Sequence, residues 1–318
     1  MAKVTAFTCG VRNGNCEILV KEALIVMEQL GIEVELIRLN DCDLKVCKGC
    51  PNGPCGDKGP EACILKDDGA WLTRKFFESD AYILAAPVWS LAPAGIVSVF
   101  RDRVFGYKAD IAGWEKFGIP QWAPKEYMKH RPGALISVGG ASTRHWTSLS
   151  MATLYTTSFS TQTNIVDQMD VYEVAGHGEI VLYEEHLARA RELGANLVYA
   201  LNHPQEDWSR KRLGDVGSEA CPGCRTSLVI ARPGTNFVEC AICGRRGFVT
   251  MEDGTFHYTW PEDPQDRLTL AGKHDHMNEI QLHGATVVGP NMDKIKEGSK
   301  KYAQWNDCVV TPPSRQKS

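Results

Sequence analysis

The sequence predicts a doubly wound α/β fold, a parallel sheet covered by helices on both faces, followed by a small cysteine-ligated metal module. Over the first 200 residues, short β-branched or apolar runs alternate with longer amphipathic stretches. The alternation repeats five times, which is the number of strands in the smaller open sheets of this class. Further along the chain, two Cys-x2-Cys motifs lie 15 residues apart, and this spacing predicts the metal module.

Each run was placed from its apolar pattern and its flanking turn residues. The five expected strands are Val4–Cys9, Glu33–Leu39, Ala81–Ala86, Ala134–Val138 and Ile165–Val174. The expected helices between and after them are Cys16–Leu30, Gly69–Glu78, Ala94–Phe105, Thr147–Ser158 and Ile180–Leu201. In open parallel sheets the ligand lies outside the carboxyl ends of the strands, so the loops that follow the strands are where the site is expected.

The chain of 318 residues is about twice a common domain length, which predicts one large core and an accessory unit. A change to charged and turn-forming residues after Asn202-His203-Pro204 predicts a linker at about 205–218. We therefore expect an α/β domain over 1–205, a metal module over 206–265 and a helical extension over 266–318. The extension is expected to hold helices Asp275–Leu282 and Asn291–Trp305 and to end in a disordered tail.

Composition argues against several classes of function. The net charge is −4 and the basic residues are spread among acidic ones, so no footprint for nucleic acid or an anionic membrane is expected. No apolar run approaches the roughly 20 residues that span a bilayer, and the chain begins on a strand-like segment rather than a signal peptide. These features predict a cytoplasmic protein, in which 12 cysteines favour metal or redox chemistry over disulfides.

The loop after the first strand has the composition of an anion cradle. It reads Cys9-Gly10-Val11-Arg12-Asn13-Gly14-Asn15-Cys16 and leads directly into a helix. Gly10 and Gly14 permit tight turns, the helix N-terminus presents unpaired N–H groups, and Arg12, Asn13 and Asn15 add side-chain donors. The cradle suits one phosphate, and no Gly-x-Gly-x-x-Gly motif for a dinucleotide is present. The alternative is a loop that merely caps the helix.

Two further loops follow strands and complete a recognisable set. Pro87-Val88-Trp89-Ser90 follows the third strand, with Asp102-Arg103 on the next helix, and Gly139-Gly140 follows the fourth, ahead of His145-Trp146. With the first loop, this set resembles the NADPH-dependent FMN reductase and iron–sulfur flavoprotein branch of the flavodoxin-like superfamily over residues 1 to about 200. The resemblance implies a flavodoxin-like, five-stranded, doubly wound domain that binds FMN.

Carried over position by position, the resemblance assigns three groups of flavin-binding residues. Those expected at the phosphate are Gly10, Arg12, Asn13, Gly14, Asn15 and Cys16, where Cys16 replaces the hydroxyl residue of the family pattern. Those expected beside the isoalloxazine are Pro87, Val88, Trp89 and Ser90 on one edge, and Gly139, Gly140 and Trp146 on the other. Trp89 and His145 are candidates for a catalytic role, the alternatives being a core aromatic and a solvated loop histidine.

The first cysteine cluster, Cys47-x2-Cys50-x4-Cys55-x7-Cys63, follows the second strand in a Gly- and Pro-rich loop. It is similar to the four-cysteine run of iron–sulfur flavoproteins, which implies a [4Fe–4S] cluster beside the flavin, although the second gap is longer here. Such a cluster accepts one electron at a time from a flavin that accepts two. The alternatives are a zinc site or reduced cysteines without metal.

The second cluster joins Cys221-x2-Cys224 to Cys240-x2-Cys243, the spacing of a zinc ribbon. Strands are expected at Leu228–Ala231 and Asn236–Glu239, with a further hairpin turn at Asp253-Gly254. A four-thiolate zinc site is structural, a rubredoxin-like iron centre being the alternative. Zinc ribbons also occur in nucleic-acid-binding proteins, but the arginines of this segment alternate with acidic residues and make a poor phosphate stripe.

Together these features predict a cytoplasmic FMN-dependent NAD(P)H oxidoreductase that passes electrons to a small organic acceptor or a protein partner. The alternatives are a non-catalytic iron–sulfur flavoprotein carrier and, more remotely, a zinc-ribbon nucleic-acid-binding protein. The choice between NADH and NADPH and the identity of the acceptor are left open. A homo-oligomer is expected from the family, and His274 and His276 are solvated residues or a metal or partner site.

Overall fold

The computed structural model describes residues 1–50, 53–204, 213–214, 220–262, 266–304, 308 and 310. Most of the expected linker and all of the expected tail from Pro312 onward lie outside these residues. Chain contacts divide the molecule into two units, Met1–Lys273 and His274–Ser318. The ribbon segment therefore groups with the α/β domain. The described helices do not include one long and apolar enough to cross a membrane.

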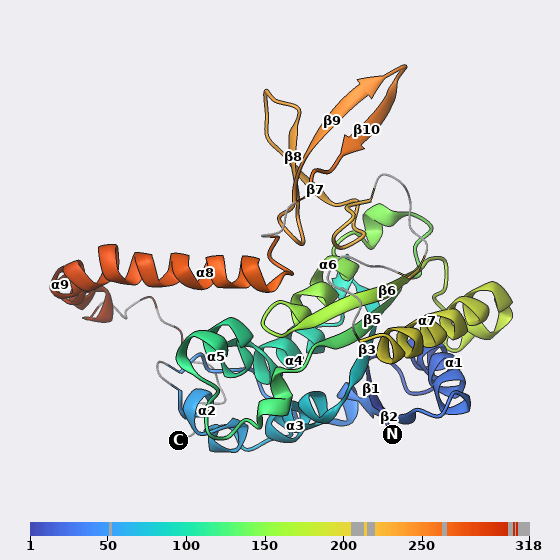
Figure 1. The fold of residues 1–318 in the computed structure, drawn as a ribbon, viewed down its shortest axis with the longest axis horizontal. Coiled ribbons are helices and arrows are strands. Elements are labelled where there is room, and N and C mark those ends of the chain that lie inside the picture. The colour runs from blue at the N-terminus through green and yellow to red at the C-terminus, as the bar shows by residue number, and fades with distance from the viewer. Residues whose placement is uncertain are drawn as a thin grey trace. The chain divides into compact units, whose positions relative to one another are not determined.

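The central sheet confirms the predicted doubly wound fold (Figure 1). Its parallel strands are β1 (Lys3–Thr8), β2 (Glu33–Arg38), β3 (Ala81–Trp89), β5 (Arg131–Val138) and β6 (Thr163–Val171). They lie in the order β2-β1-β3-β5-β6, the flavodoxin order, and the short β4 (Ala92–Pro93) pairs antiparallel to the end of β3. All five parallel strands therefore present their carboxyl ends at one edge of the sheet.

Helices cover both faces of this sheet. One face carries α1 (Asn15–Gln29) and α7 (Glu184–Asn202), which lie side by side in Figure 1. The other face carries α3 (Gly69–Glu78), α4 (Ile96–Val104) and α6 (Ser150–Tyr155). Two helices, α2 (Pro54–Asp57) and α5 (Ile111–Phe117), were not expected from the sequence. The α5 helix begins at Asp110, whose carboxylate accepts a hydrogen bond from Gly113 N–H, a capping signal that the apolar pattern did not reveal.

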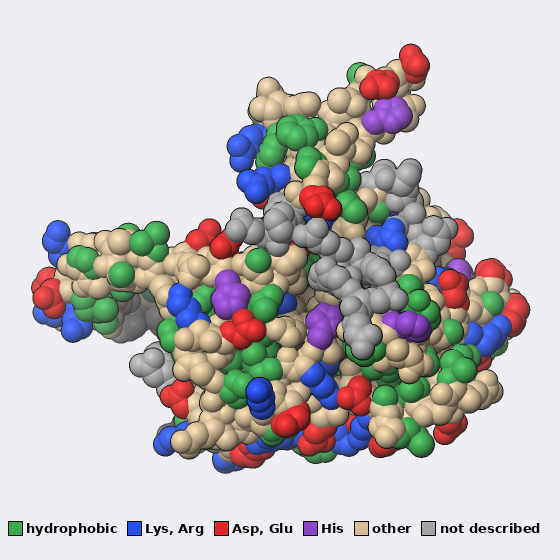
Figure 2. Space-filling model, in the orientation of Figure 1, with side chains coloured by type: hydrophobic (Ala, Val, Ile, Leu, Met, Phe, Trp, Pro, Cys, Tyr) green, Lys and Arg blue, Asp and Glu red, His purple; other side chains and the backbone are tan. Residues whose placement is uncertain are grey.

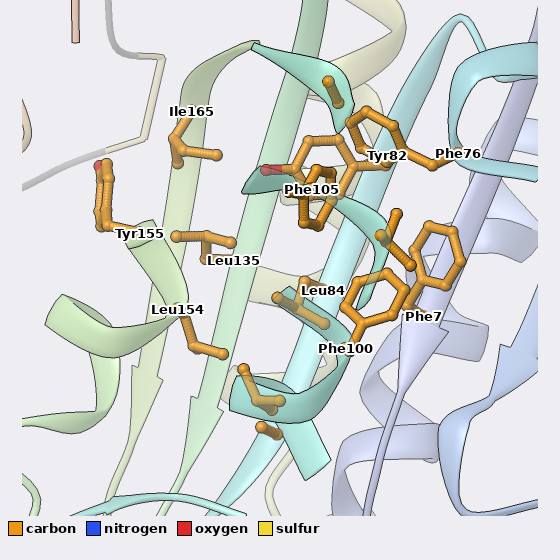
Figure 3. Packing of buried hydrophobic residues seen from close by; sticks show 14 of the residues in the cluster. Phe7, Phe76, Tyr82, Leu84, Phe100, Phe105, Leu135, Leu154, Tyr155 and Ile165 are labelled. Carbon is orange, nitrogen blue, oxygen red and sulfur yellow. The ribbon is translucent and has the colours of Figure 1, made fainter. Parts of the chain in front are cut away.

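Each sheet face has its own core because side chains alternate along the strands. On the α3–α4–α6 face, aromatic residues dominate: Phe7 lies 4.9 Å from Phe100 and Phe76 lies 4.6 Å from Phe105, measured between ring centroids (Figure 3). On the other face, small and aliphatic residues such as Ala6 and Ile83 meet α1 and α7. The aliphatic face lets its two helices approach closely, as the contact between Gly194 and Ala23 shows.

The ribbon is a second, antiparallel sheet. Its strands are β7 (Val229–Ala231), β8 (Phe237–Cys240), β9 (Arg246–Glu252) and β10 (Thr255–Thr259), paired in the order β10-β9-β8-β7. The turn between β9 and β10 lies at Asp253-Gly254 as expected. Buried Arg245 pairs with buried Asp266 at 3.1 Å, and Lys273 donates hydrogen bonds to the carbonyls of Ser158 and Thr161. These contacts tie the end of the ribbon to the α/β domain.

The second unit contains α8 (Leu270–His283), which begins before the unit boundary, and α9 (Met292–Gln304). All described residues of α9 are exposed. His276 is exposed and lies 3.5 Å from Glu279 within the same helix. On the visible face of the molecule, basic and acidic side chains are interspersed over the α/β domain, in keeping with the mixed charge of the sequence (Figure 2).

The contact between α1 and α7 generates a prediction about Gly194. A Cβ atom at this position would lie 2.5 Å from the carbonyl oxygen of Ala23 on the facing helix. Replacing a helix glycine with alanine normally stabilises a protein. Here the two helix backbones approach so closely that the same replacement is destabilising. We expect Gly194→Ala to lower the free energy of unfolding by about 2 kcal/mol, measured by denaturant titration. Glu185→Ala, on the exposed side of the same helix, should change it by less than about 0.5 kcal/mol, and a stabilised Gly194→Ala would contradict the packing.

Candidate functional site

A cavity of about 330 Å³ opens at the carboxyl edge of the sheet. Four loops line it, those after β1, β3, β5 and β6, so it lies where the doubly wound topology places a ligand. Its lining residues are Cys9, Gly10, Val11, Gly14, Asn15, Cys16, Pro87, Val88, Trp89, Val138, Gly140, Val174, Ala175, Gly176 and His177.

The first loop forms the cradle from its backbone. Gly10 has a φ of +111° and a Cβ there would lie 3.2 Å from Pro87 Cγ, while a Cβ on Gly14 would lie 2.8 Å from the carbonyl oxygen of Val11. Only glycine fits both positions without displacement. Gly14 precedes α1 and offers no side chain to cap it, so the amides of the first turn face the cavity mouth uncapped. This arrangement suits an anion such as a phosphate.

Three polar side chains of this loop have structural partners. Arg12 pairs with Asp41 at 2.8 Å, and both side chains are exposed. Asn13 donates its backbone N–H to Glu17 and accepts a hydrogen bond from Lys21 on its side-chain oxygen. Neither Arg12 nor Asn13 lines the cavity. Asn15 does, but its amide bridges to the loop after β6, donating to Gly176 O at 2.8 Å and accepting from Ile180 N–H at 3.1 Å.

Glu17 anchors the first turn of α1. Its carboxylate is almost fully buried and accepts two hydrogen bonds from Arg38, at 2.7 and 2.8 Å, and one contact from Lys21 at 2.6 Å. The Arg38 bonds are the main cause that lowers the pKa of Glu17 to about 2, and burial opposes them only in part. The ion pair ties the start of α1 to the end of β2.

The wall of the cavity is formed by the carboxyl end of β3. Pro87, Val88 and Trp89 line it, and the Trp89 side chain is 55% exposed, so its ring offers a flat open surface. Ser90 and Leu91 both have positive φ, at 52° and 71°, which makes the tight turn between β3 and β4. Leu91 O accepts a hydrogen bond from Leu149 N–H at 3.1 Å, which fixes this turn to the loop after β5.

Of the remaining predicted residues, some line the cavity and others do not. Gly140 lines the cavity and approaches Ala175, whereas Ser90, Gly139 and Trp146 do not line it. His145 is exposed beside Trp146, with ring centroids 5.5 Å apart. The segment Val174–His177 was missed. His177 lines the cavity, and its Nε2 lies 3.0 Å from Arg12 O of the first loop. The signal was available, because Gly176-His177-Gly178 also follows a strand.

The first cysteine cluster gathers around a separate small hollow. Cys47, Cys50, Cys55 and Cys63 line it together with the cations Arg103 and Lys108. Arg103 donates a hydrogen bond to Cys63 Sγ at 3.3 Å and forms a buried ion pair with Asp67. Burial opposes ionisation of Cys63, but the Leu65 N–H and the two cations outweigh it and lower the pKa of this thiol. The hollow therefore favours the thiolate form of Cys63.

The second cluster has a tighter geometry. Its four Sγ atoms all lie within 4.8 Å of one another, with Cys221–Cys243 at 3.5 Å and Cys224–Cys240 at 3.3 Å, and all four residues are fully buried. A tetrahedral zinc–thiolate site separates its sulfurs by about 3.8 Å, so this set fits a single metal ion. Among the described residues, no three cysteines of the first cluster are gathered as tightly.

The two Cys-x2-Cys turns, or knuckles, differ at the residue that follows the second cysteine. From the sequence, Gly223 and Gly244 are expected to relieve the backbone at these two turns. Gly244 has a φ of +74° as expected, but the matching residue of the first knuckle is Arg225, with a φ of +62°. Gly223 instead allows close approach to the metal site, since a Cβ there would lie 3.3 Å from Cys243 Sγ.

The strand order of the sheet and the cavity at its carboxyl edge define a protein of the flavodoxin-like fold. Residues 2–163 match the family described as NADPH-dependent FMN reductase, and the chain belongs to this family. Family membership supports FMN as the flavin and a flavin-dependent oxidoreductase activity.

The similarity to one named protein covers more of the chain than the family match does. The chain is 27% identical over 292 residues to a flavone synthase of Aspergillus candidus, an alignment that covers 89% of this chain and 88% of the relative. It is 36% identical over 107 residues to an iron–sulfur flavoprotein of Archaeoglobus fulgidus, which covers 33% of this chain and 46% of that protein. A solved flavone reductase matches with a TM-score of 0.78 at 22% identity, covering 98% of this chain and 100% of that chain, which shows a shared fold.

The buried carboxylate of Glu17 gives a pH-dependent prediction. Its folded pKa lies below the unfolded value, so the stabilisation is present above about pH 4.5 and is lost as the pH falls toward about 2. We expect Glu17→Gln to reduce the free energy of unfolding by about 2 kcal/mol at neutral pH. Denaturant titrations of both proteins from about pH 7 to about pH 3 should show this difference shrinking with acidification. A difference that is independent of pH would contradict the assignment.

Proposed function

We propose that the protein is an FMN-dependent NAD(P)H oxidoreductase that passes electrons to a planar organic acceptor. This proposal rests on one observation: a single cavity at the sheet edge is lined by both the glycine-rich cradle and the exposed Trp89. FMN bound there supplies hydride chemistry at its N5 atom. Family membership, which supports flavin-dependent oxidoreductase activity, agrees with this assignment.

The residues of the cavity have separable roles in this proposal. The uncapped amides of α1 and the backbone around Gly10 and Gly14 bind the phosphate. Trp89 and Pro87 pack against one side of the flat ring system, and Gly140 allows the ring to approach the backbone after β5. His177 links the loop after β6 to the cradle loop through its contact with Arg12 O. The open side of the Trp89 wall leaves room for a donor and then an acceptor.

The acceptor class rests on two features. The exposed Trp89 surface favours a flat aromatic compound, because offset stacking rewards planar partners. The relative aligned over most of both chains is named a flavone synthase, which supports an oxygenated aromatic ring system as the organic partner here. A polar side chain that selects one such compound is not evident among the described residues that line the flavin cavity.

A second candidate function is an electron carrier that couples the flavin to an iron–sulfur cluster. The hollow lined by four cysteines, Arg103 and Lys108 favours it, because a cluster held by four thiolates has a net negative charge that two buried cations balance. The hollow is also held in a fixed loop. Trp122 Nε1 donates to Gly56 O at 2.9 Å, and Arg74 forms a two-point ion pair with Glu61.

The main test is the identity and reactivity of the pigment. Purified protein should be yellow, and acid release followed by chromatography should yield FMN, because the cradle holds one phosphate. In anaerobic stopped-flow experiments, NADH or NADPH should bleach the flavin, and an oxygenated aromatic enone should restore its colour. A carrier would stay oxidised with both nicotinamides. Recovery of FAD, or of no flavin, would overturn the assignment of the cavity.

A pair of tryptophan variants locates the flavin. Trp89→Ala should weaken FMN binding about tenfold, since the stacked ring loses its wall. Trp71→Ala is the matched control, because Trp71 is similarly exposed on α3 but does not line the cavity. Fluorescence titration with FMN measures both, and equal effects would show that the flavin lies elsewhere.

The two cysteine clusters are predicted to hold different metals. Anaerobically prepared protein should contain about four irons and one zinc per chain. Cys50→Ser should remove the brown absorbance and leave FMN bound, since the cradle lies on another segment. Cys224→Ser should reduce solubility without changing the flavin spectrum, because a structural zinc site contributes folding free energy. Elemental analysis that finds two zincs and no iron would defeat the cluster assignment.

A further inference from the structure

The hollow around the first cysteine cluster is lined by an arginine that is buried in the core. Arg103 lies near the end of α4, and its side chain is 1% exposed. A guanidinium does not lose its proton in a protein, so its charge cannot be relieved by neutralisation. Burying such a charge is costly unless partners with good geometry offset the lost hydration. The partners of Arg103 therefore indicate what the side chain does.

The first partner of Arg103 is Asp67, which is fully buried and forms an ion pair with Nη2 of the guanidinium. The same carboxylate accepts hydrogen bonds from Lys45 N–H at 2.9 Å and from Gly69 N–H at 3.1 Å. Lys45 precedes the four cysteines in the chain and Asp67 follows them, so Asp67 closes their loop at its base. The ion pair therefore fixes the guanidinium against the loop that carries the cysteines.

The second partner of Arg103 is a cysteine of the cluster. Nη1 donates a hydrogen bond to Cys63 Sγ at 3.3 Å, which makes Arg103 a direct neighbour of a predicted metal ligand. The Nε atom is also buried, and it has no acceptor among the described residues. Buried donors without an acceptor are rare, and a group bound in the hollow would be a source of one. The donors of this side chain therefore fit a hollow that is filled by a group with acceptor sulfurs.

The chain makes room for the guanidinium at Gly69, the first residue of α3. A Cβ atom at Gly69 would lie 2.5 Å from Nη2 of Arg103. Gly69 does not have a positive φ, so the helix itself would accept alanine there. A second buried cation, Lys108, donates a hydrogen bond from Nζ to the carbonyl oxygen of Arg103. The position of Arg103 is thus determined from three sides.

We propose that Arg103 sets the reduction potential of an iron–sulfur cluster held by the four cysteines, through its hydrogen bond to Cys63 Sγ. The second candidate function, on which this inference rests, supplies the redox partners. In each transfer one electron leaves the reduced flavin and enters the cluster, and a protein partner then removes it. Two such transfers reoxidise the flavin, whose protons pass to solvent.

The direction of the effect follows from charge. Each electron adds one negative charge to the cluster and its thiolates, and hydrogen bonds to the sulfurs are among the factors that set the potential. A donor on Cys63 Sγ and a fixed positive charge both stabilise the more negative, reduced state. Because the guanidinium is almost completely buried, water and salt screen its charge little. Arg103 therefore raises the potential, and Asp67 is a positioning residue that acts through it.

An anaerobic redox titration measures this role directly. Full-length protein with FMN and iron bound is titrated while the EPR signal of the reduced cluster is followed. In Arg103→Gln, the ratio of reduced to oxidised cluster at a fixed solution potential should fall about tenfold, which is about 59 mV for a one-electron couple. Arg103→Lys keeps the charge without the guanidinium fork and should recover part of the loss. The flavin potential should not change, because Arg103 does not line the flavin cavity.

Two further variants separate the hydrogen bond from an effect on folding. Gly69→Ala keeps the arginine and its charge but displaces Nη2, so it should lower the potential in the same direction. Arg101→Gln is the matched control, because Arg101 is a partly exposed cation on the same helix that does not line the hollow, and the potential should stay the same. If Arg103→Gln does not fold or does not retain iron, Gly69→Ala decides the question.

Iron analysis of the unmodified protein distinguishes a failure of this inference from a failure of the carrier function. A protein that contains FMN but no iron would overturn both the cluster-bearing carrier and the role of Arg103. Iron bound with the same potential in the unmodified protein, in Arg103→Gln and in Gly69→Ala would overturn the role of Arg103 alone and leave the carrier function in place.

Discussion

Parallel strands cannot be joined by tight turns, and this constraint determines where every functional loop of the protein lies. Each strand of the sheet must return through a helix on one face or the other before the next strand begins. The carboxyl ends of β1, β3, β5 and β6 therefore meet at one edge, and four loops that are far apart in the sequence surround one cavity. The close approach of α1 and α7 at Gly194 keeps α1, which begins at the cradle, fixed against its neighbour. The strand topology therefore determines where the cavity lies, and the side chains determine only its lining.

Sequence patterns predicted the fold and the position of the cavity, because both depend on features that are periodic or local. The alternating apolar runs predict a parallel sheet covered by helices, and Gly10 and Gly14 mark turns in which a Cβ atom would be strained or too close to its neighbours. These are constraints that a single chain reveals without its structure.

The roles of individual polar side chains were much harder to predict. Arg12 and Asn13 are predicted phosphate ligands, and the structure adds partners that the motif does not reveal: Asp41 for Arg12, and Glu17 and Lys21 for Asn13. These partners lie on other elements, or a turn further along α1, so a motif of eight residues contains no information about them. The strained Arg225 was missed for a related reason: a knuckle motif specifies its cysteines, while the residue after the second one is free until the φ angle is known. Long-range pairing and backbone strain are properties of the folded chain.

The two cysteine clusters also differ in how far water reaches them. The ribbon thiols are completely buried, whereas Cys47, Cys50 and Cys63 are partly open to solvent. Thiol oxidation follows thiolate character and exposure, and Cys63 has both. In air, damage should therefore begin in the loop after β2 and spare the ribbon, so aerobically purified protein keeps its fold while losing whatever the loop holds. The buried thiols of the ribbon are protected from oxidation, and the solvent-exposed thiols of the loop after β2 are sensitive to oxygen.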